Sequence, residues 1–319
     1  MTLHPESEAF LEHLRQANPP AWESLSPAEA REAFASLEEA FGSKEDVDRI
    51  ENRNAGDVPM RLYGPRPSDG SPQPVVIFFH GGGFVLGDLE THDALCRRLA
   101  AWSGCNVISV DYPLSPESKG RQTLDDCWRA IGHIHRHAAD LCVDVTRMAV
   151  AGDSAGGHLA AMMALRCRDE KPAIPLKLQL LIYPVIEPFF QTESYREFAD
   201  GYGLTLENMK YFWRQFSAED DAVSGDDSPS TLTPTAATTL TGVAPAHIVT
   251  AEYDVLRDEG ETYASSLHEA GVPVVHRRYD GRLHGFVHFA GALPSGIDAA
   301  RDLADVLKAH LQPSGSSAG

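Results

Sequence analysis

The sequence contains little cysteine, and its cysteines form no pairing pattern. They are odd in number, widely spaced and never arranged as Cys-x-x-Cys: Cys96, Cys105, Cys127, Cys142 and Cys167. A disulfide framework needs paired cysteines, and a zinc knuckle needs closely spaced ones. The pattern therefore argues against both, and we expect the thiols to be reduced and mostly buried.

Long apolar runs and positive charge are also scarce. No run approaches the about 20 apolar residues that cross a bilayer, and the first residues lack the basic start and apolar segment of a signal peptide. We therefore expect a cytoplasmic protein without a membrane span. The 27 Lys and Arg residues face 46 Asp and Glu residues, which gives a formal charge of −19. Nucleic acid and anionic membranes would be repelled, so we expect neither as a partner.

Strand-like apolar runs alternate with helix-like segments through most of the chain. A chain of 319 residues can bury a large core. The alternation predicts an α/β fold with a mostly parallel sheet and helices on both faces, and such sheets bind ligands at the carboxyl ends of their strands. The predicted strands of this kind lie at 74–79, 106–110, 148–153, 178–182, 247–251 and 274–279. Two further runs, at 47–53 and 58–63, predict an antiparallel hairpin at the sheet edge.

Two segments fall outside this alternation. Residues 1–42 predict two helices, the second of which begins with a capping box from Ser26 to Glu29. Residues 184–245 are richer in aromatic side chains than a connection requires. We expect both segments to form a helical lid.

The rest of the chain completes the expected domain organisation. We expect residues 43–183 and 246–312 to make up the α/β domain itself. The tail at 313–319 is small and polar, so we expect it to be disordered.

A Gly-x-Ser-x-Gly step directly follows the predicted strand that ends at Asp153. It reads Gly152-Asp153-Ser154-Ala155-Gly156, and a helix-forming run comes after it. A strand that turns straight into a helix strains the residue at the bend and leaves no room for a neighbouring Cβ atom. The alternative is an ordinary glycine-rich turn. We interpret the step as a nucleophile elbow that exposes Ser154 and directs the backbone NH of Ala155 at whatever Ser154 attacks.

A serine hydroxyl needs a neighbouring base, and the base needs a group that orients it. Asp254 follows the next predicted strand, and His284 follows the strand after that, which is the order of an α/β-hydrolase. Asp258 competes for the acid role, but it resembles a helix-start cap. His288 competes for the base role, although the glycine beside His284 suits an exposed loop better.

Three histidines on one predicted helix resemble a metal cluster. They are His133, His135 and His137. Ile131 and Ile134 mark the buried side of that helix, so we interpret the histidines as a solvated face. We expect no metal and no cofactor.

A glycine-rich run, His80-Gly81-Gly82-Gly83-Phe84, ends the first parallel strand. Bare glycine backbone can approach a substrate closely and stabilise the oxyanion of a tetrahedral intermediate. Alone, the run could be a strand-to-helix turn. Beside Ser154 it is the lipase and esterase form of this loop. It is not a dinucleotide fingerprint, because Leu86 stands where the third glycine belongs.

Five runs together resemble the hormone-sensitive-lipase-like carboxylesterases, also called family IV bacterial esterases. They lie at 80–84, 111–117, 152–157, 254–260 and 284–286. The resemblance implies an α/β-hydrolase fold with a lid built from the N-terminus and the insertion after Pro184. It implies a catalytic triad of nucleophile, base and orienting acid: Ser154, His284 and Asp254. It also implies an oxyanion hole of backbone NH groups: those of Gly82, Gly83 and Ala155.

One loop departs from the family pattern. Relatives usually carry arginine where Pro113 stands, and a His-Pro-Phe-Pro-Ala-like run where this chain has residues 118–122. The departure concerns a loop that braces the site.

We interpret the chain as a serine carboxylesterase that hydrolyses short- to medium-chain carboxylic esters through an acyl-enzyme. Its expected partner is a small-molecule ester, held in an apolar pocket lined by Phe84, Phe212 and Phe286. One alternative is a deacetylase or amidase that acts on an acetylated small molecule with the same triad. Another is a noncatalytic small-molecule receptor, since plant gibberellin receptors resemble this family but lack the histidine. A homodimer formed through the strand at 274–279 is a further hypothesis.

Overall fold

The computed structural model describes residues 2–67, 69–217 and 231–312. At its centre lies an eight-stranded sheet with the strand order β1-β2-β4-β3-β5-β6-β7-β8. β2 runs antiparallel to both β1 and β4, and the remaining neighbours are parallel. The strands are β1 (Arg49–Ala55), β2 (Val58–Gly64), β3 (Gln73–Phe79), β4 (Asn106–Val110), β5 (Val143–Asp153), β6 (Leu178–Ile182), β7 (Ala246–Tyr253) and β8 (Val274–Leu283). The predicted mostly parallel sheet and its edge hairpin are both confirmed.

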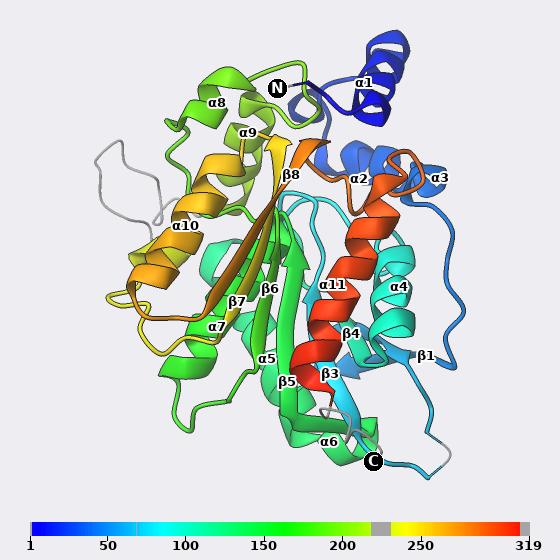
Figure 1. Ribbon diagram of the computed structural model, residues 1–319, viewed down its shortest axis with the longest axis vertical. Helices are drawn as coiled ribbons and strands as arrows, with labels where there is room; N and C mark the ends of the chain where they lie inside the picture. The colour runs from blue at the N-terminus through cyan, green and yellow to red at the C-terminus, as the bar shows by residue number, and fades with distance from the viewer. Residues whose placement is uncertain (1, 68, 218–230, 313–319) are drawn as a thin grey trace, which may run out of the picture.

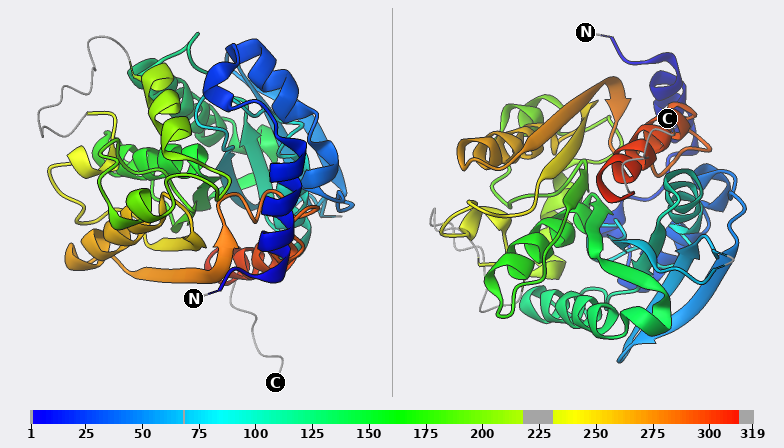
Figure 2. Two further views of the ribbon diagram at one scale, coloured as in Figure 1. Left: turned by 90° about the horizontal axis from the view of Figure 1, so that it is seen from above. Right: turned by 60° about the horizontal axis from the view of Figure 1, so that its bottom comes forward.

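Helices cover both faces of the sheet (Figures 1 and 2). Side chains alternate along a strand, so β3 sends Val75 and Ile77 into one apolar cluster and Val76 into the other. The first cluster includes side chains of α5 (Gly120–Arg136), α7 (Ala155–Asp169) and α10 (Arg257–Glu269). The second includes side chains of α4 (Asp93–Ser103) and α11 (Ser295–Leu311). A strand buried on both faces reads as an unbroken apolar run, which is why β3 was recognisable in the sequence.

The N-terminal segment and the first part of the insertion lie at the end of the molecule where the parallel strands finish, at the top of Figure 1. The N-terminal segment contains α1 (Pro5–Ala17), the 3-10 helix η1 (Trp22–Ser24), α2 (Pro27–Ala35) and α3 (Glu38–Phe41). The insertion contains α8 (Glu193–Glu197), α9 (Leu206–Phe216) and η3 (Pro234–Ala236). The amide of Asn208 donates to Glu23 at 2.7 Å and so joins α9 to η1. The predicted capping box of α2 is present, because Ser26 and Glu29 exchange backbone and side-chain hydrogen bonds.

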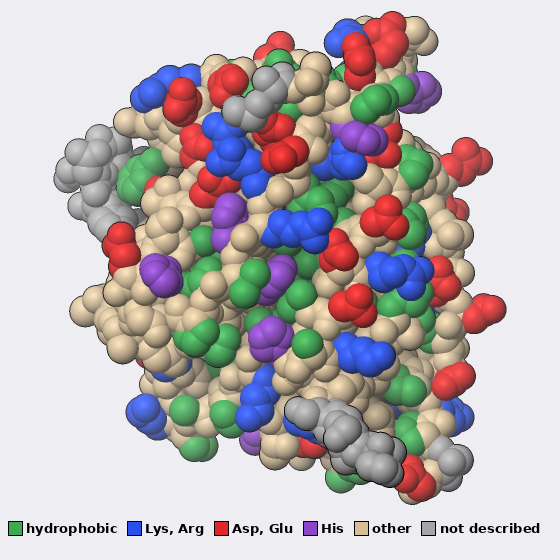
Figure 3. Space-filling model, viewed as in Figure 1, with side chains coloured by type: hydrophobic (Ala, Val, Ile, Leu, Met, Phe, Trp, Pro, Cys, Tyr) green, Lys and Arg blue, Asp and Glu red, His purple; other side chains and the backbone are tan. Residues whose placement is uncertain are grey.

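The cysteines, the length of the helices and the surface charges can be compared with what the sequence predicts. The five cysteines are free, and all but Cys142 are buried. Among the described residues, no helix is both long and apolar enough to cross a membrane. Acidic and basic side chains are interspersed on the face shown in Figure 3. Ion pairs such as Arg277–Asp302 join side chains of opposite charge. The predicted disorder of residues 313–319 lies outside the described residues.

The turn from β5 into α7 has no room for another side chain. A Cβ atom on Gly156 would collide with the backbone carbonyl of Phe79 on the neighbouring strand. By contrast, a Cβ atom on Gly132 in α5 would meet only the flexible end of Arg136, at 3.1 Å. The two glycines therefore make a matched pair for mutation.

We expect Gly156→Ala to lower the free energy of unfolding by about 3 kcal/mol, because backbone must move to admit the methyl group. Gly132→Ala should leave it unchanged or raise it by up to about 1 kcal/mol, because alanine favours a helix interior. Urea unfolding followed by circular dichroism measures both. Equal effects of the two substitutions would contradict this description of the turn.

Candidate active site

Ser154 occupies the bend between β5 and α7. Its backbone lies at φ 53° and ψ −119°, a strained conformation for a residue with a side chain. The NH of Ser154 donates to the carbonyl of Ile182 at 2.8 Å, and its carbonyl accepts from Val185 at 3.1 Å. Both partners belong to β6 and the loop that follows it. The bend is therefore fixed by the neighbouring strand as well as by its own glycines.

Two later loops bring His284 and Asp254 to Ser154. His284 Nε2 lies 2.9 Å from Ser154 Oγ, and His284 Nδ1 lies 2.7 Å from Asp254 Oδ2. Asp254 follows β7 and His284 follows β8, so both lie at the same sheet edge as Ser154. Asp254 is only 2% exposed, and its second oxygen accepts a hydrogen bond from the NH of Leu256. The three side chains predicted from the sequence thus form one continuous chain of hydrogen bonds.

The competing residues lie elsewhere. Asp258 is within the first turn of α10, and its carboxylate binds Arg257 at 2.8 Å and the NH of Ser194 at 2.7 Å. It therefore does not cap α10 as predicted; Leu256 holds the N-cap position. His288 is buried, and its ring stacks on His92 at 4.0 Å. Neither residue has a hydrogen bond to Ser154 or His284.

The helix with three histidines carries no grouped ligand set. The rings of His133 and His137 stack at 4.0 Å, and His137 Nδ1 bonds to the carbonyl of His133. Within the part of the chain that the structure describes, no three His, Cys, Asp or Glu side chains are placed to hold one metal ion.

The loop after β3 is held in place by hydrogen bonds from several segments. The NH of Gly81 donates to Asp153 Oδ1 at 2.9 Å, and Tyr112 Oη donates to the carbonyl of His80 at 2.8 Å. The carbonyl of Gly82 accepts from the NH groups of Val85 and Leu86 at 3.1 and 2.8 Å. Gly82 lies at φ 112°, and a Cβ atom there would collide with Leu86. The loop is thus a tight turn whose shape requires glycine.

The Asp153 carboxyl and three histidine rings form a buried cluster next to this loop. His92 Nε2 is 3.3 Å from Asp153 Oδ1, and both side chains are almost fully buried. Burial raises the pKa of Asp153, but the charge and hydrogen bond of His92, with His288 and His80 nearby, lower it to about 2. Burial also lowers the pKa of His80 to about 4, so this ring is neutral near pH 7.

Sequence reasoning missed several supports of the site. Asp153 stands inside the Gly-x-Ser-x-Gly step, but nothing in the motif indicates that its carboxylate reaches Gly81. His92 carries no sequence signal. Tyr183 follows β6 directly, and its ring lies 4.8 Å from the ring of His284. Its backbone, at φ 35°, marks it as a strained position that only the structure reveals.

The three predicted pocket residues separate into two groups. Phe84 stacks on Phe216 of α9 at 4.0 Å, and the ring of Phe212 lies against Gly83. Phe286 is instead fully buried with Tyr183 and Tyr279, in the cluster that includes α4 and α11. All three rings are buried: Phe84 and Phe212 belong to the cluster on one face of the sheet, and Phe286 belongs to the cluster on the other.

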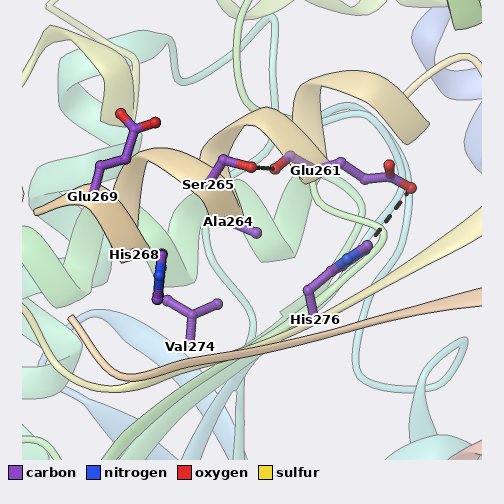
Figure 4. A pocket seen from close by; sticks show the side chains of 7 residues that line it. All are labelled: Glu261, Ala264, Ser265, His268, Glu269, Val274 and His276. Atoms are coloured by element: carbon purple, nitrogen blue, oxygen red, sulfur yellow. Dashed lines mark hydrogen bonds and ion pairs between the residues drawn. The ribbon is translucent and has the colours of Figure 1, made fainter. Parts of the chain in front are cut away.

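A separate surface groove of about 480 Å³ runs between α10 and β8 (Figure 4). Glu261 points toward His276 there, and Glu261 Oε1 lies 3.9 Å from His276 Nε2. The groove is lined by Glu261, Ala264, Ser265, His268, Glu269, Val274 and His276. None of these residues belongs to the hydrogen-bonded chain around His284.

The buried Asp153 makes stability sensitive to acid. A carboxyl whose pKa is lower in the folded than in the unfolded state stabilises the fold at neutral pH, and this stabilisation is lost as the pH falls through the folded value. We expect the free energy of unfolding to lose about 2 kcal/mol from this group between pH 4 and pH 2. Asp153→Asn should flatten that part of the profile, measured by urea unfolding at several pH values. Parallel profiles would show that Asp153 has an ordinary pKa.

Known proteins are similar to this chain in sequence and in architecture. Residues 76–288 match a family described as the alpha/beta hydrolase fold. The carboxylic ester hydrolase LipN of Mycobacterium tuberculosis is 39% identical over 262 residues, which cover 81% of this chain and 68% of LipN. The ethyl acetate hydrolase of Pseudomonas putida is 31% identical over 98% of this chain and 100% of its own length.

A solved structure agrees over almost the whole chain. It is the ester-hydrolase EH1AB1 from the metagenome of Lake Arreo, complexed with a derivative of bipyridine phosphonate. It superposes with a TM-score of 0.90 at 37% identity and covers 97% of this chain and 99% of that one. The chain therefore belongs to the α/β-hydrolase fold family, in its hormone-sensitive-lipase-like esterase group.

Proposed function

We propose that this protein hydrolyses carboxylic esters, with Ser154 as the nucleophile. The supporting observation is the hydrogen-bonded chain in which His284 lies 2.9 Å from the serine and 2.7 Å from Asp254. An imidazole that donates its Nδ1 hydrogen to a carboxylate presents Nε2 as the acceptor for the serine proton. Relatives named as a carboxylic ester hydrolase and an ethyl acetate hydrolase support the ester as substrate.

The reaction proceeds in two halves. Ser154 Oγ attacks the ester carbonyl while His284 takes its proton, and His284 then gives that proton to the departing alcohol. This leaves an acyl group on Ser154. Water, deprotonated by His284, attacks the acyl-enzyme, and the carboxylic acid is released as Ser154 regains its proton. Asp254 stays ionised throughout and stabilises the imidazolium that forms in each half.

The negative charge of each tetrahedral intermediate needs donors close to the serine. We assign this role to the backbone NH groups of Gly82, Gly83 and Ala155. Ala155 is the first residue of α7, where free NH groups and the helix dipole both favour an anion. The bonds from Asp153 and Tyr112 hold the glycine loop in one shape, so its donors need little reorganisation when charge develops.

We assign the lid to residues 1–42 and 184–245. Asn208 and Glu23 join the two segments, and the insertion places the ring of Phe212 against Gly83. An apolar side chain at this point favours an apolar acyl group beside the oxyanion donors. We therefore propose an ester of a short- to medium-chain acid as the substrate, with Phe212 beside its acyl group and Phe84 buried behind, against Phe216.

Substitution of the nucleophile tests this function. We expect Ser154→Ala to lower kcat for a chromogenic butyrate ester by at least about 10⁴-fold, because the acyl-enzyme no longer forms. The exposed Ser265 on α10 offers a matched control, and Ser265→Ala should keep full activity. Retained turnover in Ser154→Ala would overturn the proposal.

A matched butyramide should react far more slowly than the butyrate ester. A faster reaction of the amide would favour the deacetylase alternative.

We also propose a homodimer through β8. This strand pairs with β7 on one side only and ends the sheet, and its Val275 is 56% exposed. An open strand edge with an exposed apolar side chain can pair with a second copy. Light scattering should give twice the chain mass of 34.7 kDa, and Val275→Lys should shift the protein toward a monomer. A monomeric wild-type protein would refute the dimer.

A further inference from the structure

Arg31 of α2 connects the N-terminal segment to the glycine-rich turn after β3. Among the described residues 2–42, no other side chain has a hydrogen bond to this turn. Helix α2 buries Ala30 and Phe34 on its apolar face, so its position on the α/β domain is fixed. Arg31 leaves this helix at the edge of the buried face and is 30% exposed.

The guanidinium of Arg31 joins three segments. Its Nε donates to the carbonyl of Val85 at 2.9 Å, and its Nη2 donates to the carbonyl of Ser115 at 2.9 Å. The same group forms a two-pronged ion pair with Glu117 at 3.0 and 2.6 Å. Only the planar fork of arginine offers donors in these directions at once, because the lysine ammonium is a point charge.

The carbonyl of Val85 belongs to the turn that carries the assigned oxyanion donors. The NH of Val85 donates to the carbonyl of Gly82, so the two residues are directly coupled. Ser115, the second carbonyl partner of Arg31, donates its own NH to the carbonyl of Phe84 at 2.8 Å. Arg31 therefore bonds to the turn both directly, at Val85, and through Ser115, at Phe84, which are the residues that follow Gly82 and Gly83.

We propose that Arg31 is a positioning residue that fixes the oxyanion loop by holding the carbonyls of Val85 and Ser115. The proposal rests on the assignment of Gly82 and Gly83 as oxyanion donors. It makes the N-terminal helix α2 part of the apparatus that sets the geometry of the transition state. When Arg31 is removed, the turn relaxes and its donors lose alignment with the developing charge.

The ion pair with Glu117 is the lesser part of this arrangement. Glu117 is 64% exposed, and an ion pair with one exposed partner contributes little in water. Loss of the carbonyl bonds and loss of the ion pair can therefore be separated. Arg31→Ala removes both, Glu117→Gln weakens only the ion pair, and Arg31→Lys keeps the charge without the fork.

The test measures kcat and KM for a butyrate ester, together with the inhibition constant of a trifluoromethyl ketone of the same acyl chain. Ser154 Oγ adds to the carbonyl carbon of this ketone as His284 takes the serine proton, and the carbonyl oxygen becomes an oxyanion. The strength of inhibition therefore reports on the oxyanion donors. For Arg31→Ala we expect kcat to fall roughly tenfold with KM within about twofold, and inhibition to weaken by a similar factor. This is less than the about 10²-fold loss on removal of a whole donor, because the donors are displaced and not deleted.

A set of variants separates an effect of Arg31 on the position of the oxyanion donors from an effect on the stability of the fold. Arg31→Lys should show a smaller loss of kcat than Arg31→Ala, and Glu117→Gln should lower kcat by at most about twofold. Arg15→Ala, which removes an exposed arginine of α1, should match the wild type. If Arg31→Ala does not fold, Arg31→Lys still tests the proposal, since its ketone inhibition must weaken in step with kcat.

Two results would overturn the proposal. One is an unchanged kcat and ketone affinity in both Arg31 variants, even with a lowered Tm, because Arg31 would then only stabilise the fold. The other is a rise in KM with unchanged kcat. Both differ from failure of the proposed function, in which Ser154→Ala itself would retain activity.

Discussion

The rest of this site depends on the two hydrogen bonds of His284, one to Ser154 and one to Asp254. They join a serine, an imidazole and a carboxylate from three loops that are distant in sequence, at 2.9 and 2.7 Å. The parallel sheet makes this meeting possible, because β5, β7 and β8 all end at the same edge. A register shift in any of these strands would separate the three groups. The register of these strands therefore also fixes the geometry of the three groups.

A second layer of contacts holds the bare backbone next to the serine. Asp153 binds the NH of Gly81, Tyr112 binds the carbonyl of His80, and Arg31 binds the carbonyl of Val85. Each contact comes from a different part of the chain: the elbow, the loop after β4 and the N-terminal helix. A loop held at several points loses little entropy when an oxyanion forms, which is the physical content of a preorganised site.

The features that could be predicted from the sequence are those that depend on a few neighbouring residues. The elbow around Ser154 requires glycine, and the capping box of α2 requires Ser26 and Glu29, so both could be predicted and both are present. The order of strands in the chain placed Asp254 and His284 at the correct loops. The prediction that Asp258 caps a helix was wrong because α10 starts two residues earlier than the motif indicates, with Leu256 as the N-cap. The Asp258 carboxylate instead accepts hydrogen bonds from Arg257 and from the NH of Ser194. Aromatic content alone does not tell which face of the sheet a side chain joins, so the sequence could not separate Phe286 from Phe84 and Phe212. Asp153, His92 and Arg31 act across long sequence separations, which no local pattern records.

The rate at which a fluorophosphonate labels Ser154 tests the central claim most directly, because this reaction needs the serine, its base and the orienting acid together. Peptide mass spectrometry of the labelled protein identifies the modified residue, and Asp258→Asn supplies the control for Asp254→Asn. We predict a single label on Ser154, with a rate at least about 10²-fold lower in Asp254→Asn and nearly unchanged in Asp258→Asn. A label on another serine, or equal rates in the two aspartate variants, would contradict the account.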